Sequence, residues 1–192
     1  MLGLRERRRI EMARDIHKAT LKLACQNGFS AVTTQAISKY VGISHRTFFN
    51  YYENKESALM SGVPDISEES IERFLKSELP IKENLRLLMF DFMQAATSNK
   101  EELLIVLEIV RTHPKAGQIQ LARMSEARSH LSQLLAMRIK NNSVLVLDIL
   151  AEVLLFSGWT GILRWLKEPI QLEEAFDDSW EALGEVTKIL TV

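Results

Sequence analysis

The chain has 192 residues, of which 46% are hydrophobic and 26% are charged, and this balance excludes disordered, collagen-like and fibrous proteins. A single cysteine, Cys25, cannot form an internal disulfide, which favours a reducing cytoplasmic location. The net charge of −1 hides an uneven distribution. Residues 1–60 carry 10 Lys and Arg against 5 Asp and Glu, a balance of +5, whereas residues 61–192 carry 14 against 20, a balance of −6. Residues 1–60, called the head below, are therefore basic, and residues 61–192, called the body, are acidic. The excess of positive charge in the head suggests that it binds a polyanionic partner.

The composition predicts an all-α protein, because only 8 Gly and 4 Pro separate long stretches rich in Leu, Ala, Glu, Arg and Met. No apolar signal-peptide segment is present near the N-terminus. The longest apolar stretch, residues 153–163, spans 11 residues, which is too short to cross a bilayer. We therefore expect no membrane partner.

The first sixty residues predict a helix-turn-helix. Apolar spacing and stop signals place the first three helices at 5–26, 34–40 and 45–52. Thr33 and Ser44 can cap the second and third helices with their hydroxyl groups, and Gly42 between them can adopt a positive φ. Two short helices joined by a glycine-containing turn make a helix-turn-helix.

Further helices follow in the rest of the chain, after a break at residues 62–64. Their expected ranges are 55–60, 65–79, 81–98, 100–111, 115–140, 143–167 and 171–190. The break predicts two domains, 1–62 and 63–192. Cys25 is expected to be a small packed residue of the first helix.

The third helix carries side chains suited to reading DNA. Its first turn holds His45, Arg46 and Thr47, where side chains reach base edges, and Arg46 has the fork geometry that matches guanine. Tyr51 and Lys55 follow at positions suited to the flanking phosphates. The same pattern occurs in proteins that never bind DNA, and the aromatic residues nearby are expected to pack in the core or between helices rather than stack on bases. These aromatic residues are Phe48, Phe49 and Tyr52.

Two segments carry a more specific pattern: GFSAVTTQAIS at residues 28–38 and VGISHRTFFNYYENKESAL at residues 41–59. Over roughly residues 10–60, this pattern resembles the N-terminal DNA-binding domain of TetR-family transcriptional regulators, with Ser38 and Glu53-Asn54 as minor departures. The resemblance implies a three-helix helix-turn-helix domain followed by a helical ligand-binding and dimerisation domain. The expected DNA-binding residues are Thr33, Thr34, Ser44, His45, Arg46, Thr47, Tyr51 and Lys55.

The resemblance also implies that the last two long helices form a homodimer. Apolar residues occupy more than one face of the helix at 144–166, which suits coverage by the core and by a second subunit, although both helices could instead close a monomer core. A symmetric dimer matches a palindromic operator. The candidate interface residues are Leu155, Gly158, Ile162, Trp165, Phe176, Trp180 and Leu183.

The resemblance also implies a pocket that binds a small-molecule inducer. The residues that could line this pocket could equally be ordinary core or surface residues. The candidates are Met89, Phe92, Met93, Arg111, Met124 and Arg128. The four histidines lack metal-ligand spacing, and no catalytic or phosphate-loop motif appears, so we expect no metal, no cofactor and no enzyme activity.

The leading prediction is a homodimeric, sequence-specific transcriptional regulator that represses by binding double-stranded DNA and leaves a palindromic operator when an unknown inducer binds. The alternative is a DNA-binding adaptor whose body binds a protein partner instead of a small ligand.

Overall fold

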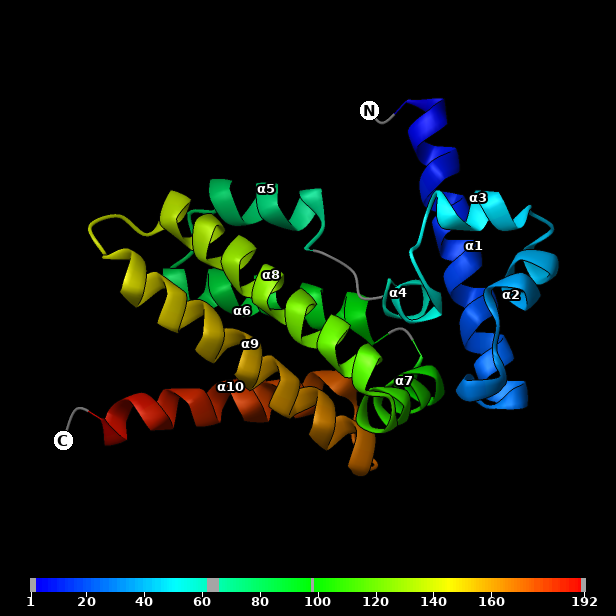
Figure 1. Cartoon of the computed structure of the whole chain (residues 1–192). Coiled ribbons are helices and arrows are strands. Elements are labelled where there is room, and N and C mark those ends of the chain that lie inside the picture. The colour runs from blue at the N-terminus through cyan, green and yellow to red at the C-terminus, as the bar shows by residue number, and fades with distance from the viewer. Residues whose placement is uncertain (1–2, 62–65, 98, 191–192) are drawn as a thin grey trace. The chain divides into compact units, whose positions relative to one another are not determined.

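The chain is almost entirely helical in the computed structural model, which describes residues 3–61, 66–97 and 99–190. These residues contain no strand, and the all-α prediction is confirmed (Figure 1). The elements in chain order are α1 (Leu4–Asn27), the 3-10 helix η1 (Phe29–Ala31), α2 (Thr34–Val41), α3 (His45–Phe49), α4 (Lys55–Met60), α5 (Glu68–Lys76), α6 (Ile81–Ala96), α7 (Lys100–Thr112), α8 (Pro114–Arg138), α9 (Val144–Lys167) and α10 (Leu172–Ile189).

Two compact units divide the chain. Unit 1 comprises Met1–Val63 and Glu101–Ala122, and unit 2 comprises Pro64–Lys100 and Arg123–Val192. Helix α8 therefore contributes its first part to unit 1 and the remainder to unit 2. The predicted break at residues 62–64 and the predicted domain boundary between residues 62 and 63 lie outside the described residues.

The predicted caps hold the ends of the short helices. The hydroxyl of Thr33 accepts from the Ala36 amide at 3.1 Å, and that of Ser44 accepts from the Thr47 amide at 3.0 Å. Gly42 ends α2 with a φ of 79°, in the left-handed region that glycine adopts without strain. Local capping chemistry thus determines where the helix-turn-helix begins and turns.

Two helices are shorter than predicted. The third was expected over 45–52, but α3 ends at Phe49 because the Asn50 amide is shared between the carbonyls of Arg46 and Thr47, at 3.2 and 3.1 Å, which tightens the last turn. The fifth was expected over 65–79, but α5 begins after its cap at Ser67 and stops before Ser77, which is extended.

The core of unit 1 joins the helix-turn-helix to α7 and the start of α8. Ile16, Ile37 and Phe48 are fully buried, and Ile109 and Ala116 belong to the same apolar cluster. Two packing predictions are wrong. Phe49 is half exposed, because the side of α3 that it occupies faces away from this cluster, and Cys25 is exposed on α1.

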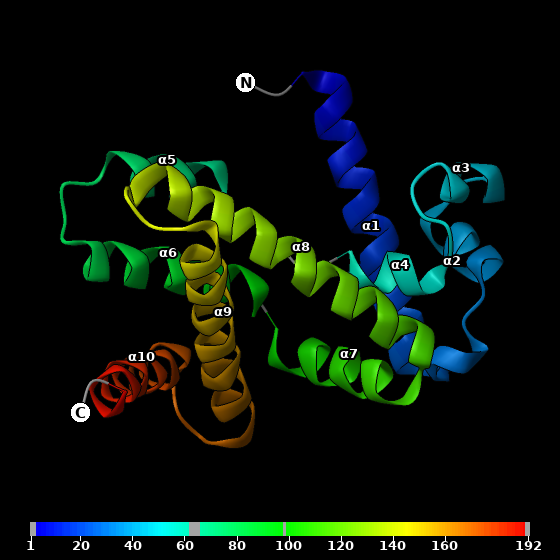
Figure 2. The same cartoon turned by 60° about the vertical axis from the view of Figure 1, so that its left-hand side comes forward.

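In unit 2, α9 and α10 lie side by side (Figure 2). Gly161 permits their close approach, since a Cβ atom there would lie 2.9 Å from the Ser179 hydroxyl and 3.1 Å from the Ala175 carbonyl oxygen. The Ser157 hydroxyl adds a buried hydrogen bond to the Ser179 carbonyl, at 3.0 Å. Gly161 thus allows α9 to approach α10 of the same chain closely.

Helix α9 is the one helix among the described residues that is long and apolar enough to cross a membrane by length and composition. The 11-residue stretch seen in the sequence understates it, because the whole helix has 24 residues. Core helices of soluble proteins meet the same criterion. Here Leu147, Ala151 and Leu154 of α9 are buried within the chain, whereas Leu145, Ile149 and Phe156 are exposed.

Candidate nucleic-acid interface

The exposed first turn of α3 begins with the predicted DNA-binding residue His45, which contacts a second one, Thr34 of α2. The His45 ring forms a 2.8 Å hydrogen bond with the Thr34 hydroxyl of α2, and it makes an edge contact with Phe49 at 4.7 Å between ring centroids. Helix α2 and the exposed Phe49 therefore orient the His45 ring. The sequence did not indicate this role for Phe49.

Arg46 lies beside it, exposed, and its guanidinium has no ion-pair or hydrogen-bond partner among the residues that the structure describes. A free guanidinium at the start of a helix-turn-helix recognition helix can bind guanine or phosphate. Its neighbour Thr47 shares a 2.7 Å hydrogen bond with Ser44, whose hydroxyl also caps the helix. Ser44 and Thr47 are thus at the exposed N-terminus of α3, where backbone amides favour an anion.

Tyr51 and Lys55, which were predicted to contact the flanking phosphates, also make contacts within the chain. Tyr51 is half-buried and packs against the unit 1 core. The Lys55 ammonium donates to the carbonyl oxygens of Phe29, Ser30 and Val32 at 2.7, 3.3 and 2.9 Å, so all three of its donors have acceptors within the chain. Lys55 thereby fastens η1 to α4, and its positive charge remains close to the surface.

A second basic group lies between α1 and α2. The Lys22 ammonium is 5.5 Å from the centroid of the Tyr40 ring, and a hydrogen bond with that phenol raises the pKa of Lys22 above its ordinary value. Lys22 therefore stays charged at every physiological pH. Both side chains are exposed, and neither was singled out from the sequence.

The predicted ligand residues lie in several different surroundings. Met89 and Met93 are fully buried beneath Gly158, where they fill the core. Met124 is exposed, and Arg128 lies near the carboxylates of Asp148 and Glu152 at 3.9 and 3.4 Å.

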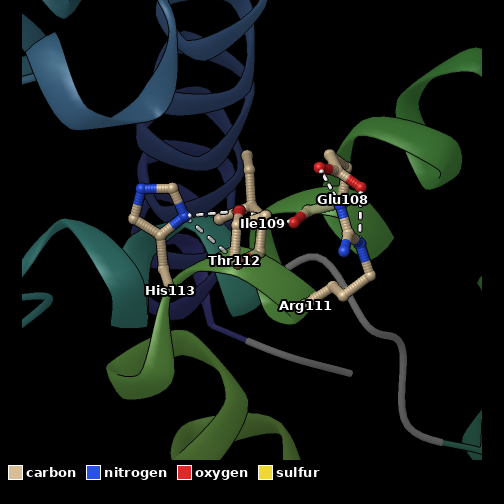
Figure 3. Close-up of polar contacts among 5 residues, drawn as sticks. All are labelled: Glu108, Ile109, Arg111, Thr112 and His113. Atoms are coloured by element: carbon tan, nitrogen blue, oxygen red, sulfur yellow. Dashed lines mark hydrogen bonds and ion pairs between the residues drawn. The ribbon is translucent and has the colours of Figure 1, made fainter.

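Arg111 belongs to unit 1, where its guanidinium donates to both carboxylate oxygens of Glu108, at 2.9 and 2.7 Å (Figure 3). These hydrogen bonds lower the pKa of Glu108. The neighbouring His113 has its Nδ1 3.2 Å from the Ile109 carbonyl oxygen, and its Nε2 forms a 3.0 Å hydrogen bond with Ser30 of η1. The residues around Arg111 thus hold the α7–α8 corner within unit 1.

Unit 2 contains a cavity of about 210 Å³ that includes one of the predicted pocket residues, Phe92. The full lining is Ile66, Ile71, Phe92, Ala127, His130, Leu131, Leu134 and Leu155. Leu155 was expected at a dimer interface instead. In the sequence, only the apolar spacing of α8 points to this cavity. Any core helix has the same spacing, so the spacing does not distinguish a cavity wall from a packed core.

The predicted interface stripe is mostly covered within the chain. Gly158, Ile162 and Phe176 are buried in unit 2, and Trp165, Trp180 and Leu183 are partly buried. A different set of apolar residues is exposed on α9 and at the end of α10. This exposed apolar face consists of Leu145, Ile149, Val153, Phe156, Val186, Ile189 and Leu190.

A capped helix-turn-helix with a free arginine at the start of its second helix is the arrangement typical of the helix-turn-helix class of DNA-binding proteins. Residues 16–59 match the model of the family described as bacterial regulatory proteins, tetR family. The predicted resemblance to TetR-family regulators is therefore confirmed for this segment, and the chain carries a TetR-type DNA-binding domain.

Solved structures share the fold along nearly the whole chain. A protein from Syntrophomonas wolfei described as a TetR-family transcriptional regulator has a TM-score of 0.70 at 17% identity, covering 92% of this chain and 94% of its own. The TetR transcriptional regulator from Nitrosomonas europaea has a TM-score of 0.61 at 12% identity, with 91% and 97% covered. A fatty acid degradation regulator from Bacillus halodurans has a TM-score of 0.55 at 16% identity, with 90% and 94% covered. No curated protein matches the chain significantly in sequence.

Proposed function

We propose that the chain is a homodimeric repressor that binds a palindromic operator through α3 and leaves it when a small apolar molecule binds in unit 2. The observation that carries the DNA-binding half of this proposal is the exposed first turn of α3, where Arg46 is free and His45 is held in place. The proposed DNA contacts are Thr33, Thr34, Ser44, His45, Arg46, Thr47 and Tyr51, with Lys55 contributing charge rather than a direct hydrogen bond.

Arg46→Ala is expected to reduce discrimination at one base position by about 1–3 kcal/mol, because a bidentate arginine contact is lost. The operator is first obtained by selection from a randomised duplex library with the wild-type protein. Gel shifts then compare this duplex with versions that carry single base changes.

Arg14→Ala is the matched control, since Arg14 is an exposed arginine of α1 that lies about 200° around the helix from the buried Ile16. It should leave base discrimination unchanged. Equal discrimination by Arg46→Ala and the wild type would contradict base reading by Arg46, and a library that yields no enriched duplex would contradict the proposed function.

The cavity in unit 2 supports a small, mainly apolar inducer. Its lining is apolar except for the His130 ring, and pockets of this type bind ligands chiefly through apolar contact. The fold neighbour from Bacillus halodurans is a regulator of fatty acid degradation, which is compatible with an acyl-chain ligand.

Helix α8 offers a physical route from this cavity to the helix-turn-helix. Ala127, His130, Leu131 and Leu134 of α8 line the cavity, and Ala116 near its start is fully buried in the unit 1 core. A ligand in the cavity would therefore contact a helix whose first part belongs to unit 1. Its effect on DNA affinity is limited by the ligand's differential affinity for the two states.

Dimerisation is supported by the exposed apolar face on α9 and α10. Phe156→Glu is expected to convert a dimer to a monomer and to remove cooperative operator binding, because it places a charge in an interface that must bury about 800 Å² per subunit to be stable. Analytical ultracentrifugation measures the change.

Leu121→Glu is the control, because Leu121 of α8 and Phe156 are both 69% exposed. It should remain dimeric. A wild-type chain that is monomeric at all concentrations would contradict the dimer and favour an adaptor that uses this face for another protein.

A further inference from the structure

Helix α1 begins with a run of exposed arginines that the helix-turn-helix does not use. Residues 4–9 are all exposed, and Arg5, Arg7, Arg8 and Arg9 fall within them. At ~1.5 Å of rise per residue, these six residues form roughly 9 Å of helix. No side chain caps the start of α1.

The arginines continue the face of α1 that packs into unit 1. At about 100° per residue, Arg5, Arg8 and Arg9 fall on the same side of the helix as Met12 and Ile16. Ile16 is fully buried and Met12 is partly buried against the same core. This face of α1 therefore carries apolar side chains where the helix packs on the core, and guanidinium groups at residues 5–9, before the packed part begins.

This arginine face, defined as Arg5, Arg8 and Arg9, lacks partners. None of its guanidinium groups makes an ion pair or a hydrogen bond with any residue in the described part of the chain. Glu6 is the acidic residue of the first helical turn, and it lies about 100° around the helix from Arg5. Three unpaired like charges repel one another, and an anionic partner would relieve this repulsion.

The arginine face lies at the end of unit 1 that also presents α3. The Tyr52 hydroxyl, just beyond α3, donates to the Ala13 carbonyl at 3.3 Å and ties this part of the chain to α1. Figures 1 and 2 both show the first turns of α1 extending past α3 from this point. A duplex held by the first turn of α3 would therefore place its flanking backbone near these turns.

We propose that Arg5, Arg8 and Arg9 form a second DNA contact surface, which binds phosphates beside the bases that α3 reads. This inference rests on the proposed operator binding. A helix that binds a membrane surface needs an apolar face to insert, whereas Leu4 is the only large apolar side chain at residues 4–9. Guanidinium groups suit phosphate oxygens because they donate bidentate, charge-assisted hydrogen bonds.

The test compares Arg8→Gln with Arg7→Gln. Both remove one charge from adjacent, exposed positions, and glutamine keeps the helix propensity, but Arg7 lies about 200° around the helix from Arg9, off the arginine face. Affinity for the selected operator duplex is measured over a series of salt concentrations. Arg8→Gln should reduce the slope of log K against log salt by about 0.9 for each head, and equally for specific and random duplexes.

The triple variant Arg5→Gln/Arg8→Gln/Arg9→Gln should reduce this slope by about 2.7 per head and shorten the hydroxyl-radical footprint at both outer edges. Arg7→Gln should change neither measurement. Circular dichroism confirms that each variant is folded.

The outcomes separate this inference from the proposed function. If the wild type enriches no duplex, operator binding itself is wrong. If it binds a palindrome and Arg7→Gln lowers the slope as much as Arg8→Gln does, the arginines act only through diffuse charge and the inference is overturned. Binding of phosphatidylglycerol vesicles that the triple variant loses, with an unchanged DNA slope, would overturn it in favour of a lipid surface.

Discussion

Phe48→Ala is expected to lower the free energy of unfolding of unit 1 by about 3–5 kcal/mol, the usual cost of truncating a buried phenylalanine. Phe48 of α3 is 0% exposed, and its ring makes an edge contact with Phe49 at 5.5 Å and a tilted contact with Tyr52 at 6.2 Å between centroids. Truncation leaves a cavity between α3 and the core that the capped, short helices cannot close. Urea unfolding, monitored by the hydrogen exchange of unit 1 amides, measures the decrease in the free energy of unfolding.

Phe49→Ala is the matched control, since the adjacent phenylalanine is 50% exposed. It should cost less than about 1 kcal/mol, because half of its surface already contacts solvent in the folded state. It should nevertheless weaken operator binding, since its ring contacts His45. Equal destabilisation by the two substitutions would contradict the orientation of α3.

Gly161→Ala is expected to destabilise unit 2 by about 1–3 kcal/mol, as overpacking does elsewhere. The added methyl group would lie 2.9 Å from the Ser179 hydroxyl and 3.1 Å from a backbone oxygen of α10. The backbone oxygen cannot rotate away, so α9 and α10 must separate and strain the Ser157–Ser179 hydrogen bond. Thermal unfolding monitored by circular dichroism measures the change.

Gly184→Ala, in the same pair of helices, is expected to raise the stability of the protein rather than lower it. Gly184 lies inside α10, and a Cβ atom there would have no neighbour within 4 Å. Alanine should therefore stabilise the protein by about 0.5–1 kcal/mol through helix propensity alone. Stabilisation by both substitutions would mean that α9 and α10 do not approach closely at Gly161.

Much of the helix-turn-helix could be predicted from the sequence, because its signals are local. Capping by Thr33 and Ser44 and the positive φ of Gly42 involve residues within three or four positions of one another. The family pattern over residues 28–59 depends on the same short-range spacing, and it is confirmed by the match over residues 16–59. The free Arg46 at the start of α3 also follows from its position in the helix.

The sequence does not show which side of a helix is buried. Phe48 and Phe49 are identical neighbours, and only the rotation of α3 against the core buries one and exposes the other. The same holds for α9, which is apolar on several faces. Met89 and Met93 of α6 cover Gly158. Ile162 is also buried, whereas Phe156 is exposed.

The sequence by itself determined that this protein is helical, that its head is a basic TetR-type helix-turn-helix, and where nearly every helix begins, because capping, spacing and charge act between near neighbours. The tertiary structure alone decided that residues 101–122 pack with the head, that the cavity gathers residues from α5, α6, α8 and α9, and that an arginine face extends past the core on α1. These features depend on contacts between residues far apart in the chain. Apolar periodicity indicates that a face is buried, but it does not indicate which partner buries it.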